Sequence, residues 1–465
     1  MNSQKDLTCV ENLKIQSYSE HPEVRAAADI LINKFYENKT RKKKVKEHTR
    51  DARKLIASLW LHKQALFKFT TMKAYFEQGA KGKRKQVWMT RRVLALFNHA
   101  MDLGWIVLHK KAIPPQLSKT GQGFNSVYRT TEIFYQLLSS LKHEDILPDL
   151  EAPRIELKGA DDVLQDIPKD YQTSDDFQAT YNVLEKHYQI LQASNLRLSD
   201  GKPVPLSHLF FVRKFKHSMT QGGRLYALIQ NYPKEERLGI TIDNLPVCSL
   251  DINQLHPQLI LRFMHKRDCE ERGLFALARG EDAYTMPDYP GLPRAIHKKL
   301  VNTLFNAKTE DAAARSLMNT YYQYDEDGEL QIKSYKGKAK RVGGKVFDGN
   351  KPKQQAHDYI ESYRQHHPQL KDAICSDFGT RLQSIDGRMM LAVIELFNHM
   401  ELPVIPVHDE LIVPRTKPTM FAAELALKDV FNSCLGEAGS FGSIFAKWSF
   451  GNDKEEKKIE IKLVT

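Results

Sequence analysis

The stretch that decides the fold reads VIPVHDELIV and covers residues 404–413. Two short apolar runs flank the acidic pair Asp409-Glu410, a pattern typical of a strand, a tight turn and a second strand. Adjacent carboxylates between apolar strands are costly unless something positive uses them. Taken alone, the segment is simply an acidic hairpin turn; the alternative is a cation-binding hairpin.

A second aspartate ends another apolar run, in the segment SLDINQLH over residues 249–256. Asp251 precedes an amphipathic helical pattern, so a helix N-cap is its structural alternative. Asp251 and Asp409 lie 158 residues apart in the sequence (409 minus 251). Two strand-end aspartates from distant segments are the donors that a two-metal phosphoryl-transfer site needs.

Positive charge is concentrated early in the chain. The 465 residues carry a net charge of +12, and residues 1–130 hold 26 Lys and Arg against 10 Asp and Glu. This surplus of +16 leaves the remaining residues with a net charge of −4. A basic first third favours a polyanion as partner. Nucleic acid is preferred to a membrane surface, because no apolar run approaches the length of a spanning helix.

The five cysteines are scattered, with no CxxC and no Cys/His pairing. Their spacing argues against a zinc site and a disulfide framework, and it favours a reducing compartment. The N-terminus is polar and lacks a signal-peptide pattern. We therefore expect a cytoplasmic protein.

The hydrophobic pattern predicts a helix-rich α+β protein. We expect a basic, helical N-terminal domain, similar to a winged helix, with a β element at residues 154–157. Its basic residues cluster at 41–54, 81–85 and 91–92, and a solvated helix face is the alternative for such runs. Residues 150–172 are interpreted as a linker, and long helices are predicted over 173–196 and 377–400.

Four segments between residues 218 and 415 then follow a fixed order. They read TQGGRL…QNYP (220–233), LDINQLH (250–256), RAIHKKLVNTLFN (294–306), and LQSID (382–386) leading to VHDE (407–410). Together they resemble the polymerase core of family A nucleic-acid polymerases, in which TGRL…LQNIP precedes DYSQIELR, RxxxKxxxF/YG, a glutamine helix and VHDE. The resemblance implies a right-hand polymerase fold: a palm with an antiparallel sheet, fingers and a thumb.

On this resemblance the chain has five parts. They are a basic, nucleic-acid-binding N-terminal domain (1–149), a linker with thumb-like helices (150–215), the first part of the palm (216–262), fingers (263–370), and the second part of the palm with C-terminal elements (371–465). The region before Gly223 is too short for the usual exonuclease domain plus a full thumb, so we expect no proofreading. Such a compact polymerase suits a mobile element or a phage-like replicon.

The resemblance also implies a metal site. Asp251, Asp409 and the backbone carbonyl of Ile252 would bind two Mg²⁺ ions, with Mn²⁺ as a substitute. Glu410 resembles an auxiliary acidic position beside these ligands.

The third segment would bind the incoming nucleotide. Arg294 and Lys298, at i and i+4 of one helix, would present two cations to the triphosphate, and Lys298 would also assist catalysis. An exposed basic helix is the structural alternative, and Lys299 replaces Lys298 if the register slips by one. Asn302 and Asn306 stand where the family has aromatic residues.

The resemblance places four further residues against DNA. Arg224, Gln383 and His408 match positions that contact the primer terminus and the minor groove, where correct base pairs present similar acceptors. Arg237 matches a positively charged position in the same palm segment as Arg224.

His256 departs from the family pattern, which has a glutamate beneath the sugar. Histidine can block a 2′-hydroxyl sterically, or it can hydrogen-bond to that group. The leading interpretation is a DNA polymerase that acts on primer-template DNA with dNTP substrates. The alternatives are a primase or single-subunit RNA polymerase of the same fold, and a catalytically silent DNA-binding replication or defence factor.

Overall fold

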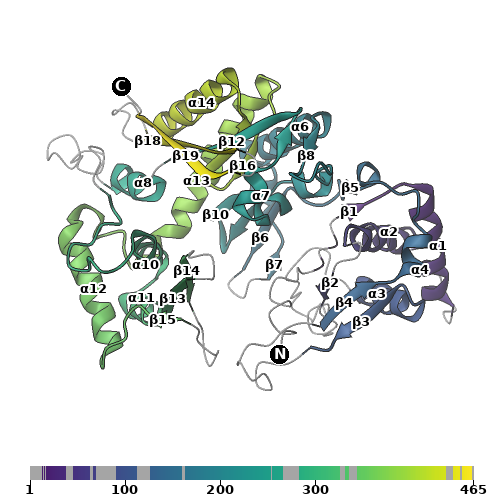
Figure 1. Ribbon diagram of the computed structural model, residues 1–465, viewed down its shortest axis with the longest axis horizontal. Helices are drawn as coiled ribbons and strands as arrows, with labels where there is room; N and C mark the ends of the chain where they lie inside the picture. The colour runs from purple at the N-terminus through teal and green to yellow at the C-terminus, as the bar shows by residue number, and fades with distance from the viewer. Residues whose placement is uncertain are drawn as a thin grey trace. The chain divides into compact units, whose positions relative to one another are not determined.

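A computed structural model of the chain describes residues 13, 15, 17–37, 45–62, 66–69, 91–112, 126–159, 163–252, 254–264, 282–324, 330–334, 343–435, 443–450 and 453–462. The protein is mixed α+β and helix-rich, as the sequence predicts (Figure 1). It divides into two compact units, the first made of residues 1–218 and 226–244 and the second of residues 219–225 and 245–465.

The first unit begins with one hydrophobic core that runs from Leu13 to Ile146. Its elements are β1 (Ser17–Tyr18), α1 (Pro22–Tyr36), α2 (Val45–Leu61), β2 (Leu66–Phe69), α3 (Arg91–Asp102), β3 (Ile106–Lys110), β4 (Ser126–Thr130), α4 (Glu132–Gln136) and β5 (Leu147–Pro148). Strands β2, β4 and β3 form an antiparallel sheet in that order. Helix α3 buries Val93, Leu96, Phe97 and Ala100, the positions that helical spacing selects for one face.

The rest of the first unit combines short strands with one long helix. Its elements are β6 (Ile155–Lys158), β7 (Leu164–Gln165), α5 (Lys169–Gln172), α6 (Asp175–Ala193), β8 (Leu196–Arg197), β9 (Val212–Lys216), α7 (Lys234–Leu238) and β11 (Thr241–Ile242). Helix α6 corresponds to the predicted helix over 173–196 and starts at Ser174, whose hydroxyl accepts a hydrogen bond from the amide of Phe177.

The interpretation of residues 150–172 as a linker is wrong. This segment contains β6, β7 and α5, and β6 pairs in parallel with β9. The β element expected at 154–157 therefore exists as β6, but its partners are β7 and β9 rather than strands of the N-terminal core. Residues 150–172 are rich in turn-forming residues, so their composition predicts a loop. The strand β6 forms because it pairs with β9, which lies far along the chain.

Within the second unit, β16, β17, β12, β18 and β19 pair with one another in that order. These strands are β12 (Leu245–Ile252), β16 (Ile405–Val407), β17 (Glu410–Pro414), β18 (Ser443–Phe450) and β19 (Asp453–Lys462). Helix α14 (Lys417–Leu435) packs on β12 and β17 and against α13 (Phe378–His399), and α13 contacts α8 (Leu255–Met264) (Figure 1). The strand–turn–strand over 404–413 and the helix over 377–400 are confirmed.

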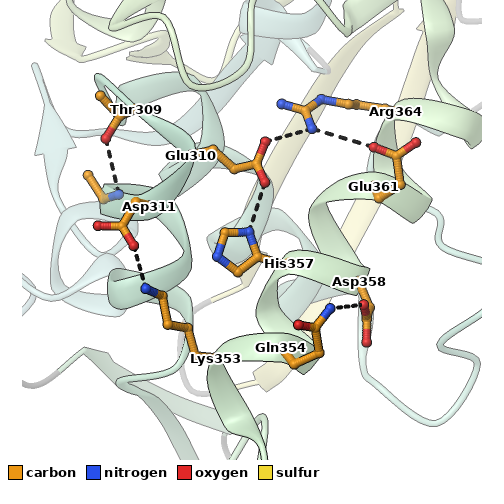
Figure 2. A network of polar contacts seen from close by, with 10 residues as sticks. Thr309, Glu310, Asp311, Lys353, Gln354, His357, Asp358, Glu361 and Arg364 are labelled. Atoms are coloured by element: carbon orange, nitrogen blue, oxygen red, sulfur yellow. Dashed lines mark hydrogen bonds and ion pairs between the residues drawn. The ribbon is translucent and has the colours of Figure 1, made fainter.

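A helical part of the same unit carries the predicted nucleotide-binding segment. Its elements are α10 (Arg294–Asn306), α11 (Glu310–Leu317), β13 (Thr320–Tyr324), β14 (Leu330–Ser334), β15 (Gly344–Lys345) and α12 (Pro352–His366). Figure 2 shows how α11 is tied to α12: the Glu310 carboxylate accepts from His357 and from Arg364, each at 2.8 Å. Hydrogen bonds from Arg364 and then His357 hold the pKa of Glu310 below its ordinary value.

Candidate active site

The acidic pair near the C-terminus lies on a two-residue hairpin. Val407 pairs with Glu410, so His408 and Asp409 form the turn between β16 and β17. His408 has φ of 60°, a left-handed conformation that is uncommon outside glycine. The simpler interpretation, an acidic hairpin turn, describes this backbone correctly.

Strand register gives the hairpin a second property. Asp251 lies directly opposite Glu410 in the antiparallel pair β12–β17. Residues directly opposite in such a pair project from the same face of the sheet, with Cβ atoms about 4.5–5.5 Å apart. Helix α8 begins at Leu255, four positions after Asp251, so the N-cap interpretation of Asp251 is wrong. The fold thus places Asp251, Glu410 and the adjacent Asp409 at the same end of two neighbouring strands.

This donor set suits a divalent cation that keeps part of its own hydration. Within the described ranges, no three His, Cys, Asp or Glu side chains converge as a ready-made metal cage. Mg²⁺ is commonly held by one or two carboxylates plus water and substrate phosphates, which an aspartate opposite a glutamate can supply. Ile252, whose carbonyl is a further expected donor, pairs with Ile444 of β18 at the same strand end.

Arg224 and Asp386 join two distant motif segments. Arg224 Nε donates to Asp386 Oδ2, and Asp386 is fully buried in helix α13. Arg224 Nη2 lies 3.0 Å from His256 Nε2. We call these three residues the Arg–His–Asp clasp. The sequence assigned separate roles to Arg224 and His256 and none to Asp386, although Asp386 stands within the LQSID segment.

Glycines allow the clasp to form. Gly222 and Gly223 in strand β10 (Ser218–Tyr226) have φ of 74° and 80°, which other residues rarely adopt. A Cβ at Gly387 of α13 would lie 2.0 Å from the carbonyl oxygen of Gly223. The backbones of β10 and α13 therefore approach so closely that only glycine fits, and this approach brings Arg224 to Asp386.

The clasp keeps Asp386 ionised. Burial alone would raise the pKa of the Asp386 carboxyl, but His256 and Arg224 outweigh burial and hold that pKa below its ordinary value. His256 Nε2 is 3.9 Å from Asp386 Oδ2, too far for a hydrogen bond. We therefore assign most of the lowering to Arg224, whose guanidinium is always charged.

Helix α10 presents the predicted cations to solvent. Arg294, Lys298 and Lys299 are all exposed. Asn302 is half-buried, and its carbonyl accepts a hydrogen bond from Asn306 Nδ2 at 2.7 Å. The side chain of Asn306 also lies against Gly379, so the end of α10 lies close to α13.

Arg294 has a carboxylate partner that the sequence did not reveal. Its Nη2 donates to Asp282 Oδ1 at 2.9 Å, its Nε donates to Asp282 Oδ2, and its guanidinium lies 5.1 Å from the ring centre of Tyr284. Burial raises the pKa of Tyr284, Arg294 opposes this rise, and Asp409 adds to it. Tyr284 therefore lies within electrostatic range of both Arg294 and Asp409. Asp282 and Tyr284 stood outside every quoted motif, so no sequence signal pointed to them.

The remaining predicted DNA contacts fall in different places. Gln383 is half-buried in α13, three positions before Asp386 and thus on the same side of the helix. His408 is half-buried in the hairpin turn. Arg237 belongs to α7 of the first unit, where Nη1 donates to the carbonyl of Tyr232 at 2.6 Å.

Part of the positive charge in the N-terminal domain is used internally. Lys54 pairs with the buried Asp149 at 2.7 Å, Arg53 with Glu20 at 2.8 Å, and Arg92 with both Glu47 and Asp51 at 2.7 Å. Lys46, Lys111 and Arg129 are exposed. The basic residues at 41–44 and 81–85 lie outside the described residues. Within the run at 41–54, the alternative of a solvated helix face therefore does not describe Arg53 and Lys54, whose side chains make ion pairs.

Within the part of the chain that the structure describes, no helix is long and apolar enough to span a membrane. No family model and no curated protein matches this chain. Among solved structures, the chain is similar to the POL domain of Pol1 from M. smegmatis in complex with DNA primer-template and dNTP, with a TM-score of 0.32 and 14% sequence identity. The match covers 58% of this chain and 51% of that structure, so it spans about half the length of that structure.

Proposed function

We propose that this chain catalyses template-directed nucleotidyl transfer, as a DNA-dependent DNA polymerase of the family A type. One observation carries the proposal: Asp251 lies opposite Glu410 on one face of the sheet, beside Asp409 in the hairpin turn. Carboxylates at adjoining strand ends are the ligands that phosphoryl transfer with two divalent cations requires.

The chain's own residues would hold the reactants. Asp251 and Asp409 would bind two Mg²⁺ or Mn²⁺ ions, which when bound supply charge neutralisation at the attacking 3′-oxygen and the leaving pyrophosphate. Arg294 and Lys298 would contact the triphosphate from the exposed face of α10. Lys298 would offset negative charge as pyrophosphate leaves.

The duplex end would be recognised by the side of α13 that carries Gln383, together with Arg224 and His408. Arg224 has five N–H donors and gives one to Asp386 and one to His256, so donors remain for minor-groove acceptors. The right-hand division into palm, fingers and thumb follows from the same proposal, with the sheet β16-β17-β12-β18-β19 as palm and α10–α12 as fingers.

We also propose that the N-terminal domain binds DNA as a winged helix. The support is topological: α2, β2, α3, β3 and β4 follow one another in the chain, and the sheet order is β2-β4-β3. Exposed Lys46, Lys111 and Arg129 give this domain cations for phosphate contacts.

A second candidate is RNA synthesis by a primase or a single-subunit RNA polymerase. The observation that favours it is His256, which stands at the position of the family's ribose-excluding glutamate. An imidazole that hydrogen-bonds to the 2′-hydroxyl would select NTPs, whereas one that blocks this group would select dNTPs.

Template-dependent extension assays separate these functions. We expect dNTP incorporation that requires a primer and Mg²⁺, and that is lost in Asp251→Asn. Incorporation of NTPs without a primer would contradict the proposed DNA polymerase function and support the primase-like alternative. A third outcome is that the protein binds DNA and incorporates neither substrate at any Mg²⁺ or Mn²⁺ concentration tested. That result would support a catalytically silent DNA-binding factor.

A further inference from the structure

Asp386 is the only anion that contacts Arg224 among the described residues. The Arg224 side chain is 17% exposed and Asp386 is 0% exposed, so both charges are largely removed from water. Asp386 Oδ1 is also buried, with no hydrogen-bond partner in the described part of the chain. Each charge therefore depends on the other, and removing the carboxylate would leave a nearly buried guanidinium without a counter-ion.

The contact between Arg224 and His256 constrains the hydrogen-bonding role of the imidazole. Arginine has donors and no acceptor, so at 3.0 Å His256 Nε2 must accept a hydrogen bond from Arg224 Nη2. A neutral imidazole in this arrangement carries its proton on Nδ1. Within the described residues, Arg224 and Asp386 are the polar contacts of the His256 side chain, and both are made through Nε2. Neither of these contacts uses Nδ1.

We propose that Asp386 is a positioning residue for sugar selection, acting through Arg224 to hold His256 in one orientation and one tautomer. The proposal rests on the proposed polymerase function, because it takes His256 to lie beneath the sugar of the incoming nucleotide. A rigid imidazole excludes or recognises a 2′-hydroxyl at a defined place, whereas a mobile one does neither well. Selection of the sugar is thereby linked to a carboxylate 162 residues from Arg224 in the chain.

Loss of the Asp386 carboxylate would leave both Arg224 and His256 without a fixed position. In Asp386→Asn the carboxamide keeps the size of the side chain but not its charge, so Arg224 would turn toward water or a DNA phosphate. His256 would then lose its donor at Nε2 and sample other rotamers and the other tautomer. The expected result is weaker discrimination between dATP and ATP, whichever of the two the unmodified protein prefers.

The experiment compares the ratio of kcat/KM for dATP and ATP on a primed template in four proteins: the unmodified chain, Asp386→Asn, His256→Ala, and the double variant. Asp149→Asn is the matched control, because Asp149 forms a buried ion pair with Lys54 in the first unit. We expect Asp386→Asn to move the ratio toward one by about tenfold, the effect of losing one hydrogen bond. His256→Ala should do the same, and the double variant should add nothing further, because both changes act on one arrangement.

Three results would overturn the proposal. One is an unchanged ratio in Asp386→Asn when His256→Ala changes it. Another is multiplication of the two effects in the double variant. A third is an equal change of the ratio in Asp149→Asn at a similar loss of thermal stability, which would make the effect one of general destabilisation.

A readout without turnover separates this proposal from the polymerase function. The nitrogen chemical shifts of His256 should show the Nδ1–H tautomer in the unmodified protein and a mixture of tautomers in Asp386→Asn. If neither dATP nor ATP is incorporated, the polymerase function fails. Calorimetry then measures the affinities for the Mg²⁺ complexes of dATP and ATP. The role of Asp386 in sugar selection is supported if Asp386→Asn moves the ratio of the two affinities toward one. It is contradicted if the ratio is unchanged or if neither nucleotide binds.

Discussion

Asp251 and Glu410 face each other across the strand pair β12–β17, at the strand end where the β16–β17 hairpin turns. Like charges directly opposite in an antiparallel pair destabilise the sheet. A cation bound by both carboxylates would cancel this repulsion and so stabilise the folded protein. Function and stability should therefore respond in opposite directions to the loss of either charge.

Asp251→Asn should abolish incorporation while stabilising the metal-free protein. Removal of the repulsion is worth about 0.2–1 kcal/mol, so Tm in EDTA should rise by about 1–3 °C. Added Mg²⁺ should raise the Tm of the unmodified protein but not that of the variant. Scanning calorimetry and primer extension measure both effects, with Asp429→Asn, an exposed acid of α14, as the control for net charge. Retention of more than about a tenth of the rate would mean that the active site is misplaced.

Lys298→Ala should raise the apparent KM for nucleotide and slow incorporation, whereas Lys299→Ala should change neither strongly. Both lysines are exposed, but only Lys298 lies at i+4 from Arg294 and so shares its face of α10. Steady-state kinetics on a primed template compare this matched pair. The reverse ranking would shift the motif by one residue.

Asp282→Asn should lower the apparent KM for nucleotide, because Asp282 holds the guanidinium that the triphosphate would use. Arg294 is 52% exposed, and exposed ion pairs contribute about 0.2–1 kcal/mol, which limits the gain to about fivefold. Arg294→Ala should raise KM in the same assay. A higher KM in Asp282→Asn would instead make Asp282 a residue that orients Arg294 for the substrate.

Gly387→Ala should destabilise the protein, although alanine is the better helix former. The new Cβ would meet the backbone oxygen of Gly223 at 2.0 Å, and overpacking of this kind costs about 1–3 kcal/mol. Gly379→Ala in the same helix is the matched control, because its Cβ would meet the movable side chain of Asn306. Urea denaturation should give a clearly larger loss for Gly387→Ala. Equal losses would contradict the close approach of β10 and α13.

Combined replacement of Lys46, Lys111 and Arg129 by alanine should weaken DNA binding and flatten its salt dependence. Each lost phosphate contact lowers the slope of log K against log salt concentration by about 0.9. Lys202→Ala is the control, since Lys202 pairs with Asp200 at 2.6 Å. Fluorescence anisotropy at several salt concentrations gives the slopes. If the triple variant shows the same slope of log K against log salt concentration as the unmodified protein, the proposal that the N-terminal domain binds DNA is contradicted.

The sequence by itself determined the local elements of the site. Alternating and helical spacing of apolar residues predicted the hairpin over 404–413 and the helix α13, because such patterns reflect which side of one element is buried. The acidic pair and the GRL, RxxxK and LQSID segments supplied the residues that we propose bind metal, nucleotide and DNA. The turn-rich composition of residues 150–172 wrongly predicted a linker, because β6 is specified by its pairing with β9.

Only the tertiary structure decided which residues act together. The register that sets Asp251 opposite Glu410 is a property of two strands from distant segments, and nothing within either strand encodes it. The ion pair of Arg224 with Asp386 likewise depends on the close approach that Gly223 and Gly387 permit. Contacts of this kind arise from packing and from pairing of buried charges, which act over three-dimensional distance and leave no periodic trace along the chain.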